Sequence, residues 1–487
     1  MEEQKEKIIA SPKNWRSLPV SGPEAKRLAH ELNLEPSTAR ILFQRGYRTP
    51  ETAEKFLKGS LKDLPDPMIL PDMEKGVLRI QKALAKKEKI FLFGDYDVDG
   101  VTGTAILKLF LESQGGDVQA ILPNRFQDGY GLSVKIVERV MEQKGTLLIT
   151  IDNGTRSFEP IRFARSHGVD VIVLDHHEVP EGDLGAVAVI NPKAETEEKQ
   201  LPLCAAGIAF YVVIALRSFL RRENSYREGD LVRYLDLVTL GTIADVVPLV
   251  GVNRLLVREG LKRLADPLWE GLKALKAEAG IEGEVTAGQV GFRLAPRLNA
   301  AGRLEHAELS LRLLTTFDPT EAKNLATKLG EMNRRRQEEE EGILKEAEEM
   351  MSSSGLLPKS GIFLAKEGWH EGVLGIVAAR LSERYYRPAL VLTLNEERGK
   401  GSGRSIPGFN LHGCLSECAT HLGKWGGHKA AVGLTLPRAN LDLFRDAFLK
   451  VSGDHLKNLD DKPSLTIETL LPFSELTPKL LEELKTM

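Results

Sequence analysis

Three aspartates on alternate positions mark the stretch F-L-F-G-D-Y-D-V-D-G-V-T-G-T, residues 91–104. Asp95, Asp97 and Asp99 follow a short apolar run, Ile90–Phe93, whose length suits a fully buried strand. Carboxylates grouped at the end of a buried strand repel one another and are costly to remove from water. A divalent cation among them is the simplest remedy, so the stretch predicts a metal site.

The same aspartates and Gly100 also fit the first half of a calcium-binding EF-hand loop. That loop needs a bidentate Glu at its twelfth position and a helix before it. Ile106 stands twelfth from Asp95, and an apolar strand precedes, so the EF-hand is excluded. A solvated acidic turn remains the plain alternative for this stretch taken alone.

Two further acids follow or interrupt apolar runs. Leu147–Ile149 leads to Asp152 in I-D-N-G, and Asp245 stands within G-T-I-A-D-V-V-P. A turn would explain Asp152 taken alone, and a helix cap would explain Asp245.

A third apolar run, Val171–Leu174, ends in Asp175, His176 and His177. Adjacent histidines at the end of a strand are rarely structural. One can ligate a metal while the other contacts a phosphate, and the carboxylate beside them can fix the tautomer of an imidazole.

The elements around these residues alternate. Strands are expected at 89–93, 118–122, 146–151, 169–174 and 186–190, and helices at 72–87, 102–114, 133–143, 158–166, 204–222 and 230–241. This alternation predicts a mostly parallel sheet with helices on both faces, whose ligands bind outside the carboxyl ends of the strands. The acids and histidines fall there. Oxygen and imidazole donors without thiolates suit two Mn²⁺ or Mg²⁺ ions, which together can catalyse a phosphoryl displacement. The residues alone therefore predict metal-dependent hydrolysis of a phosphoester or phosphoanhydride.

The fold class predicted for the whole chain is α/β, with two α/β domains joined by a long helix. The predicted parts are an N-terminal helical lead-in (1–71), the first α/β domain (72–315), the polar connector helix (316–355), a smaller α/β domain (356–451) and a tail (452–487). Strands near 361–365, 389–394 and 431–436 and a helix at 372–386 define the smaller domain.

Composition restricts the setting. The 487 residues carry a net charge of -3, are 42% hydrophobic and include three cysteines, which excludes a disulfide framework and suits a reducing compartment. The N-terminal M-E-E-Q-K-E-K lacks a signal core, and the longest apolar run, Leu203–Leu216, is too short to span a membrane. We therefore expect a cytoplasmic protein without a membrane partner. The global charge neither favours nor excludes nucleic acid.

Four stretches, G-D-Y-D-V-D-G, I-D-N-G, L-D-H-H and G-T-I-A-D-V-V-P-L, resemble in order and spacing the motifs of the DHH phosphoesterases. Residues 296–303, 368–380, 401–409 and 426–434 resemble the bacterial single-strand-specific exonucleases of that family. The resemblance covers about residues 75–451. It implies a DHH domain at 72–315, a DHH-associated substrate-binding domain at 356–451, and the incomplete start of an OB-fold-like domain, or a tail, at 452–487.

The resemblance also implies site residues. The implied metal ligands are Asp95, Asp97, Asp99, Asp152, Asp175, His176 and Asp245, and the implied catalytic residues are Asp152, His176 and His177. Asp152 would bridge the two Mn²⁺ or Mg²⁺ ions, and His177 would contact the scissile phosphate. Asp95 and Asp175 would be ligands or supports. Many relatives carry a His at the position of Phe93, so the coordination of the first ion is open.

Nucleic-acid contacts are implied in both domains, by Arg297, Asn299 and Arg303 in the first and by Arg404, Ser405, Gly426, Gly427 and His428 in the second. The implied function is a 5′→3′ exonuclease specific for single-stranded DNA. It would release 5′-mononucleotides in DNA repair and recombination, as a monomer, with a single-strand-binding protein or a helicase as candidate partners.

Two alternatives stay open. An oligonucleotide or cyclic-dinucleotide phosphodiesterase would share the metal site, but the long motifs of the second domain speak against it. A non-catalytic replication scaffold of the same superfamily would lose metal ligands, and this chain retains Asp97, Asp99, Asp152, His176, His177 and Asp245.

Overall fold

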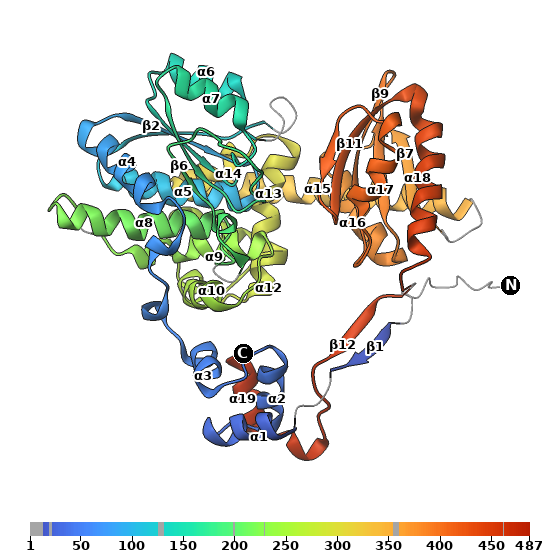
Figure 1. The fold of residues 1–487 in the computed structure, drawn as a ribbon, viewed down its shortest axis with the longest axis horizontal. Helices are drawn as coiled ribbons and strands as arrows, with labels where there is room; N and C mark the ends of the chain where they lie inside the picture. Colours follow the sequence, from blue (N-terminus) through green and yellow to red (C-terminus); the bar gives the residue numbers. More distant parts are fainter. Residues whose placement is uncertain are drawn as a thin grey trace. The chain divides into compact units, whose positions relative to one another are not determined.

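The computed structural model describes residues 13–18, 22–124, 131–197, 200–227, 229–353, 360–460 and 462–487. The chain divides into two compact units, one of Lys55–Arg334 and the other of Arg335–Met487 together with Met1–Glu54. Helix α15 (Pro319–Ser353) contributes to both units (Figure 1). Two α/β parts and a long helix are therefore confirmed. The domain boundaries stay predictions, and the one at 355/356 lies outside the described residues.

A parallel five-stranded sheet forms the centre of the first unit, in the order β3-β2-β4-β5-β6 (Figure 1). Its strands are β2 (Lys89–Gly94), β3 (Asp117–Ile121), β4 (Leu147–Ile151), β5 (Asp170–Leu174) and β6 (Ala188–Ile190). The chain passes from β2 to β3 on one side and then to β4 on the other. The carboxyl ends of β2 and β4 are thus the switch point where open sheets bind ligands.

Helices cover both faces of this sheet, as the nearly continuous apolar strands require. Phe91 and Phe93 of β2 pack with α6 (Val134–Glu142) and α7 (Phe158–Ser166). The intervening Leu92 packs on the other face. That face is covered by α4 (Met73–Lys86), α5 (Val98–Ser113) and α8 (Ala205–Arg222).

Helix α5 begins at Val98, four residues before the predicted start at residue 102. Asp97 causes the difference, because its Oδ1 accepts hydrogen bonds from the backbone N–H groups of Asp99 (3.0 Å) and Gly100 (3.1 Å). The last aspartate of the motif therefore lies in the first helical turn and not in a loop.

Further helices complete the first unit: α9 (Leu235–Ala244), α10 (Gly251–Ala265), α11 (Glu270–Glu278), α12 (Ala287–Gln289), η6 (Val290–Leu294), α13 (Ala295–Leu304) and α14 (Glu308–Thr315). Helix α9 packs against α5, α8 and α10, and η6 is a π-helix that runs directly into α13. Two of these elements, α9 and α13, approach the motif of three aspartates.

The second unit holds a mixed sheet in the order β10-β11-β9-β8-β7. Its strands are β7 (Ile362–Glu367), β8 (Ala389–Leu394), β9 (Arg398–Arg404), β10 (Trp425–Gly427) and β11 (Ala431–Pro437). Only β7 and β8 pair in parallel among these described strands. Helices α16 (Leu374–Tyr385), α17 (Leu411–Glu417) and α18 (Leu441–Leu456) pack on the sheet. The sequence patterns did not predict β9 and β10.

The segments near the two ends of the chain lie together. β1 (Asn14–Ser17) pairs in parallel with β12 (Ser464–Ile467), and α19 (Pro478–Lys485) packs on α2 (Pro36–Gln44) (Figure 1). Arg40 of α2 forms an ion pair of 2.6 Å with Glu475. Helices α1 (Gly22–Glu31) and α3 (Pro50–Lys58) complete this part. No described helix combines the length and the apolar character needed to cross a membrane.

Candidate metal centre

Three overlapping groups of acidic and histidine side chains lie at the carboxyl edge of the first sheet. They are Asp95, Asp97 and Asp152; Asp152, His176 and His177; and Asp99, His176 and Asp245. Within each group the donor atoms lie within 4.8 Å of one another. Asp152 and His176 each belong to two groups, which makes the three groups one continuous cluster of seven residues.

Asp99 is held by a helix that begins more than 100 residues later. Its Oδ2 and Oδ1 accept hydrogen bonds from the backbone N–H groups of Ala205 (2.6 Å) and Ala206 (2.9 Å), the first residues of α8. The amino end of a helix offers unpaired N–H groups and a partial positive charge. The buried carboxylate is thereby oriented and partly compensated.

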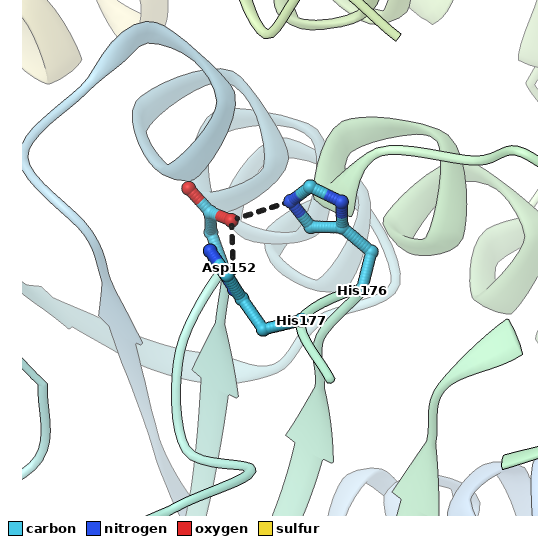
Figure 2. A group of neighbouring side chains, drawn as sticks. All are labelled: Asp152, His176 and His177. Carbon is cyan, nitrogen blue, oxygen red and sulfur yellow. Dashed lines mark hydrogen bonds and ion pairs between the residues drawn. The ribbon is translucent and has the colours of Figure 1, made fainter. Parts of the chain in front are cut away.

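Asp152 sits in a turn that imposes strain. Its φ is +63°, in the left-handed region, and its N–H donates to the carbonyl of Leu174 at 2.9 Å. Asn153 supports the turn through a hydrogen bond from its Nδ2 to the carbonyl of Ile151 at 2.9 Å. The cost of a left-handed aspartate is of the kind found at functional sites. The turn directs the carboxylate toward the two histidines, and one of its oxygens faces both (Figure 2).

The two histidines meet Asp152 from different sides. Nε2 of His176 lies 3.1 Å from Asp152 Oδ1, 3.6 Å from Asp245 Oδ2 and 3.8 Å from Asp99 Oδ2. Nδ1 of His177 lies 3.9 Å from Asp152 Oδ1 (Figure 2). His176 therefore faces three carboxylates through one nitrogen.

Asp175 lies behind the cluster and belongs to none of the three groups. Its Oδ1 accepts from His177 Nδ1 at 2.7 Å and from the backbone N–H of His176 at 2.8 Å. Its Oδ2 accepts from Thr155, through the backbone N–H at 3.1 Å and through Oγ1 at 2.5 Å. These contacts give Asp175 the geometry of a residue that fixes the orientation of His177.

Asp245 ends helix α9 at its carboxyl terminus. An acid there opposes the helix dipole, so helix capping does not explain it. Gly241, one turn earlier, lets α9 approach the site, because a Cβ at this position would lie 2.8 Å from Asp99 Oδ1 and 2.5 Å from Thr102 Oγ1. The close approach brings the Asp245 carboxylate to His176.

Burial and mutual repulsion dominate the electrostatics of the acids. Burial raises the pKa of Asp152 well above its usual value, and the carboxylates of Asp97, Asp99 and Asp95 raise it further. The pKa of Asp245 rises to about 8 for the same reasons, with Asp99 the strongest neighbour. Without a cation, the cluster thus disfavours its own charged form.

The histidines shift in opposite directions. Burial lowers the pKa of His176, which therefore stays neutral and able to ligate. The hydrogen bond with Asp175 raises the pKa of His177. Burial favours a higher pKa for Asp175, but its bonds with His177 and Thr155 outweigh that effect and keep its pKa well below the usual range.

The chemistry of this cluster fits divalent metal ions. Asp95, Asp99 and Asp152 are each at most 4% exposed, and a cation would offset the burial and the repulsion that raise the pKa of Asp99 and of Asp152. Cys204 is buried beside Asp99, but burial raises the pKa of its thiol far above the usual value, so it stays protonated. Oxygen and imidazole donors remain, the set preferred by Mn²⁺ and Mg²⁺.

Phe93 does not take part in the cluster. Its side chain is fully buried in the core beneath α6 and α7. Asp95, by contrast, joins a group with Asp97 and Asp152, and its N–H donates to the carbonyl of Ile151 at 3.1 Å. The geometry thus gives Asp95 the position from which it could serve the first ion in place of an imidazole.

The sequence patterns missed residues at the end of β6. Asn191 is fully buried, and its Nδ2 donates to the carbonyl of His177 at 2.9 Å. Lys193 forms an ion pair of 3.0 Å with Glu178, and its charge acts on both His176 and Asp245. Asn191 and Lys193, two polar residues just after the apolar run 186–190, are the signal that could have revealed this part of the site.

The predicted nucleic-acid contacts of the first unit lie on α13. Asn299 Oδ1 accepts from the backbone N–H of Val98 at 3.1 Å, which ties α13 to the start of α5. Arg303 follows Asn299 by one turn. Arg297 instead donates from Nη1 to the carbonyl of Arg293 at 2.7 Å. The structure brings α13 to the aspartate motif, whereas contact with nucleic acid stays a prediction.

The predicted contacts of the second unit gather at one end of its sheet. Arg404 pairs with Ala431 in the register of β9 and β11, and Ser405 N–H donates to the carbonyl of Ala430 at 2.9 Å. Gly426 and Gly427 form β10 on the other side of β11, and His428 follows. These five predicted residues therefore lie on neighbouring segments of one sheet.

Replacement of Asp175 by Asn should lower kcat/KM for the predicted metal-dependent phosphoester hydrolysis about 10- to 100-fold. This is the usual effect of losing a group that orients a metal-site histidine. The pKa of His177 should fall with it, so the loss should be larger near neutral pH than in mild acid. Steady-state rates with Mn²⁺ would measure both effects. Asp117→Asn, at the exposed start of β3, is the control, and unaltered rates in Asp175→Asn would exclude this role.

Comparison with known proteins agrees with this geometry. Residues 89–242 match the DHH family, N-terminal domain, and residues 359–453 match the DHHA1 domain. The metal cluster described above lies in the first match, except for Asp245, three residues beyond it.

Relatives extend the similarity over nearly the whole chain. The single-stranded-DNA-specific exonuclease RecJ of Bacillus subtilis (strain 168) is 37% identical over 485 residues, which cover 99% of this chain and 60% of the relative. That of Dickeya dadantii (strain 3937) is 39% identical over 435 residues, which cover 86% of this chain and 75% of the relative. The chain thus spans about three fifths of the length of the first relative.

A solved structure is similar as well. The crystal structure of RecJ in complex with Mn²⁺ from Thermus thermophilus matches with a TM-score of 0.84 at 32% identity. The match covers 97% of this chain and 67% of that chain.

Proposed function

The chain belongs to the RecJ family of DHH phosphoesterases, and on that premise we propose that it is a metal-dependent exonuclease that degrades single-stranded DNA from the 5′ end. The observation that carries the proposal is the cluster of buried carboxylates and histidines at the switch point of the first sheet. Similarity to relatives supports membership of a family, but it does not show that the metal-binding residues are present and close together. The cluster supports the proposal because these residues do lie together in this chain.

The proposed ligands follow two of the three groups. One ion would be held by Asp95, Asp97 and Asp152, and the second by Asp99, His176 and Asp245, with Asp152 between them. Bound ions would supply electrostatic stabilisation of the attacking and leaving oxygens of the phosphodiester.

The two adjacent histidines would have different functions, metal ligation for His176 and phosphate binding for His177. His176, kept neutral by burial, would present Nε2 as a ligand. His177, whose pKa is raised by Asp175, would carry positive charge and bind the scissile phosphate. Its position is fixed through Nδ1, so the charge would stay in one place during the reaction.

The second unit would bind the nucleic-acid backbone. Arg404 donates from Nη1 to the carbonyl of Gly403 at 2.8 Å, which fixes its guanidinium at the end of β9. A Cβ on Gly375, in the first turn of α16, would lie 3.1 Å from Arg404 Nη2. An arginine beside the amino end of a helix is a suitable setting for a phosphate. We therefore assign Arg404, Ser405, Gly426, Gly427 and His428 to phosphate binding.

End-labelled oligonucleotides test the proposal. With Mn²⁺, the chain should release 5′-mononucleotides from single strands labelled at the 5′ end, whereas label at the 3′ end should be released last. A blunt duplex of the same sequence is the control and should resist. Equal rates on a dinucleotide, a cyclic dinucleotide and a long strand would favour the oligonucleotide phosphodiesterase. No release with either Mn²⁺ or Mg²⁺ would favour the scaffold.

The biological setting stays a prediction. A role in DNA repair and recombination, a cytoplasmic location, a monomeric state, and partnership with a single-strand-binding protein or a helicase would all be compatible with an exonuclease of this kind. Size measurement in solution would test the monomer directly.

A further inference from the structure

Two exposed apolar side chains lie on elements that adjoin the candidate metal centre, the end of α9 and the π-helix η6 that packs on α9. Phe292 is 86% exposed and Val246 is 85% exposed. Val246 directly follows Asp245, and Phe292 lies at the middle of the π-helix η6. Single exposed apolar residues are common and need no explanation. These two differ because both stand on irregular backbone, and both belong to elements that contact the residues around the site.

Ile243 connects the two residues. Its carbonyl accepts the N–H of Val246 at 3.2 Å. A Cβ on Gly291, the neighbour of Phe292, would lie 3.7 Å from Ile243 Cγ2. The π-helix therefore packs on the last turn of α9, which is the turn that presents Asp245 to His176.

The helix of Phe292 also leads to the aspartate motif. η6 continues into α13, and Asn299 stands about two turns beyond Phe292, where its Oδ1 accepts the N–H of Val98. Gly302, one turn further, lies so close to the motif that a Cβ there would be 2.6 Å from the carbonyl of Tyr96. The aromatic ring is thus carried by the same continuous helix that contacts the loop of the metal ligands.

The backbone at both positions departs from regular structure. Val246 has a φ of +60°, and a β-branched residue in this region is a genuine outlier. π-helical turns such as η6 occur frequently at functional sites. Neither feature gains packing, because both side chains remain in water. Irregular backbone that supports exposed apolar groups beside ligands indicates a binding role.

We propose that Phe292 is a stacking platform for a nucleobase of the substrate strand, with Val246 as a second apolar contact. The inference rests on the proposed function and adds a residue that selects single strands. A base can stack on a protein ring only when it has left its own duplex stack, and all four bases offer a suitable face. Phe292 would therefore favour unpaired DNA without reading its sequence.

Steady-state kinetics on a single-stranded oligonucleotide test the inference. Phe292→Ala should raise KM about tenfold, within the range that loss of one stacked base produces, with kcat nearly unaltered. Phe292→Trp and Phe292→Tyr should keep the KM of the parent chain, because both retain a flat ring. Phe473→Ala is the matched control, since Phe473 is 92% exposed on η9 (Phe473–Glu475) in the other unit. The melting temperature should be the same in all variants, because neither ring is packed.

A scan with single abasic sites locates the stacked base. For the parent chain, one abasic position should raise KM about as much as Phe292→Ala does, and in the variant that position should have no further effect. If the parent chain releases nucleotides but Phe292→Ala leaves KM unaltered, the stacking inference is wrong and the proposed exonuclease stands. If the parent chain releases no nucleotides under any metal condition, the proposed function itself is wrong.

Discussion

Asp152→Asn should abolish metal-dependent turnover and leave a folded protein. Asp152 belongs to the group proposed for the first ion, and its Oδ1 lies 3.1 Å from Nε2 of His176, a proposed ligand of the second ion, so its loss should affect both ions. Metal ions supply several kcal/mol of charge stabilisation to a phosphoryl displacement, and each ~1.4 kcal/mol corresponds to tenfold in rate. We therefore expect kcat to fall about 1000-fold or more. Release of labelled nucleotide in the presence of saturating Mn²⁺ is the measurement.

Asn is the better replacement because of the backbone. Asp152 has a φ of +63°, a conformation that Asn accepts more readily than Ala. A loss of activity in Asp152→Asn is then a loss of charge and not of local structure. Without metal this variant should melt at a higher temperature than the parent chain near neutral pH, because Asn avoids the cost of burying an acid whose pKa burial and neighbouring carboxylates raise well above its usual value. Asp183→Asn, on an exposed loop, is the control, and substantial activity in Asp152→Asn would refute a bridging role.

Removal of metal should have the second large effect. A chelator should stop turnover and lower the melting temperature of the first unit. A ligand at 100 times its dissociation constant stabilises the folded state by about 2.7 kcal/mol. For a unit of this size we expect Mn²⁺ to raise the melting temperature by about 5–10 °C, as measured by calorimetry with and without chelator. KCl at the same ionic strength serves as the control for general ionic effects.

The stabilisation of the folded protein by Mn²⁺ should increase as pH rises. The folded metal-free protein holds protons on Asp152 and Asp245, whose pKa values are raised by burial and by neighbouring acids, that of Asp245 to about 8. The stability gained from these protons is complete below the ordinary carboxyl pKa and is lost as pH rises towards about 8. The metal-free protein should therefore lose stability over that interval. Ion binding displaces the protons, so the stabilisation by Mn²⁺ should grow with pH.

Asp245→Asn separates this linkage from the titration of the rest of the chain. Its metal-free form should melt above the parent chain at mildly alkaline pH and together with it in acid, because the fold retains the proton of Asp245 and retaining it costs more free energy as pH rises above the ordinary carboxyl pKa. A parent chain whose metal-free stability rises through this interval, with no difference from Asp245→Asn, would contradict the electrostatic picture.

Sequence patterns predicted the first unit well because its signals are local. Apolar runs such as Leu147–Ile151 are long enough and sufficiently β-branched to define buried strands, and the acids that follow each run lie at the same edge of a parallel sheet. Three such stretches and the acid that ends helix α9 predicted one cluster, and the structure brings Asp95, Asp97, Asp152, His176 and Asp245 together.

Local sequence patterns did not predict strands that lack a hydrophobic pattern and form through contacts with other strands. Strand β9, with the sequence R-G-K-G-S-G-R, has no apolar alternation. Its glycines let it approach β8, because a Cβ on Gly403 would lie 2.4 Å from Leu390 Cδ2. The pairing of β1 with β12 joins segments about 450 residues apart, which no local periodicity records. Both features depend on contacts between strands and not on the strands themselves.

The candidate site divides in the same way. The types of donor and their order along the chain were determined by the sequence, since oxygen and imidazole groups after buried strands specify a hard divalent metal wherever the strands meet. Only the tertiary structure decided the position and the contacts of each donor. It set Asp175 behind His177, tied Asp99 to the amino end of α8, and kept Phe93 in the core. It also placed Phe292 on the helix that reaches the motif. These positions depend on the distances between side chains and on their burial, and contacts between residues far apart in the chain determine both.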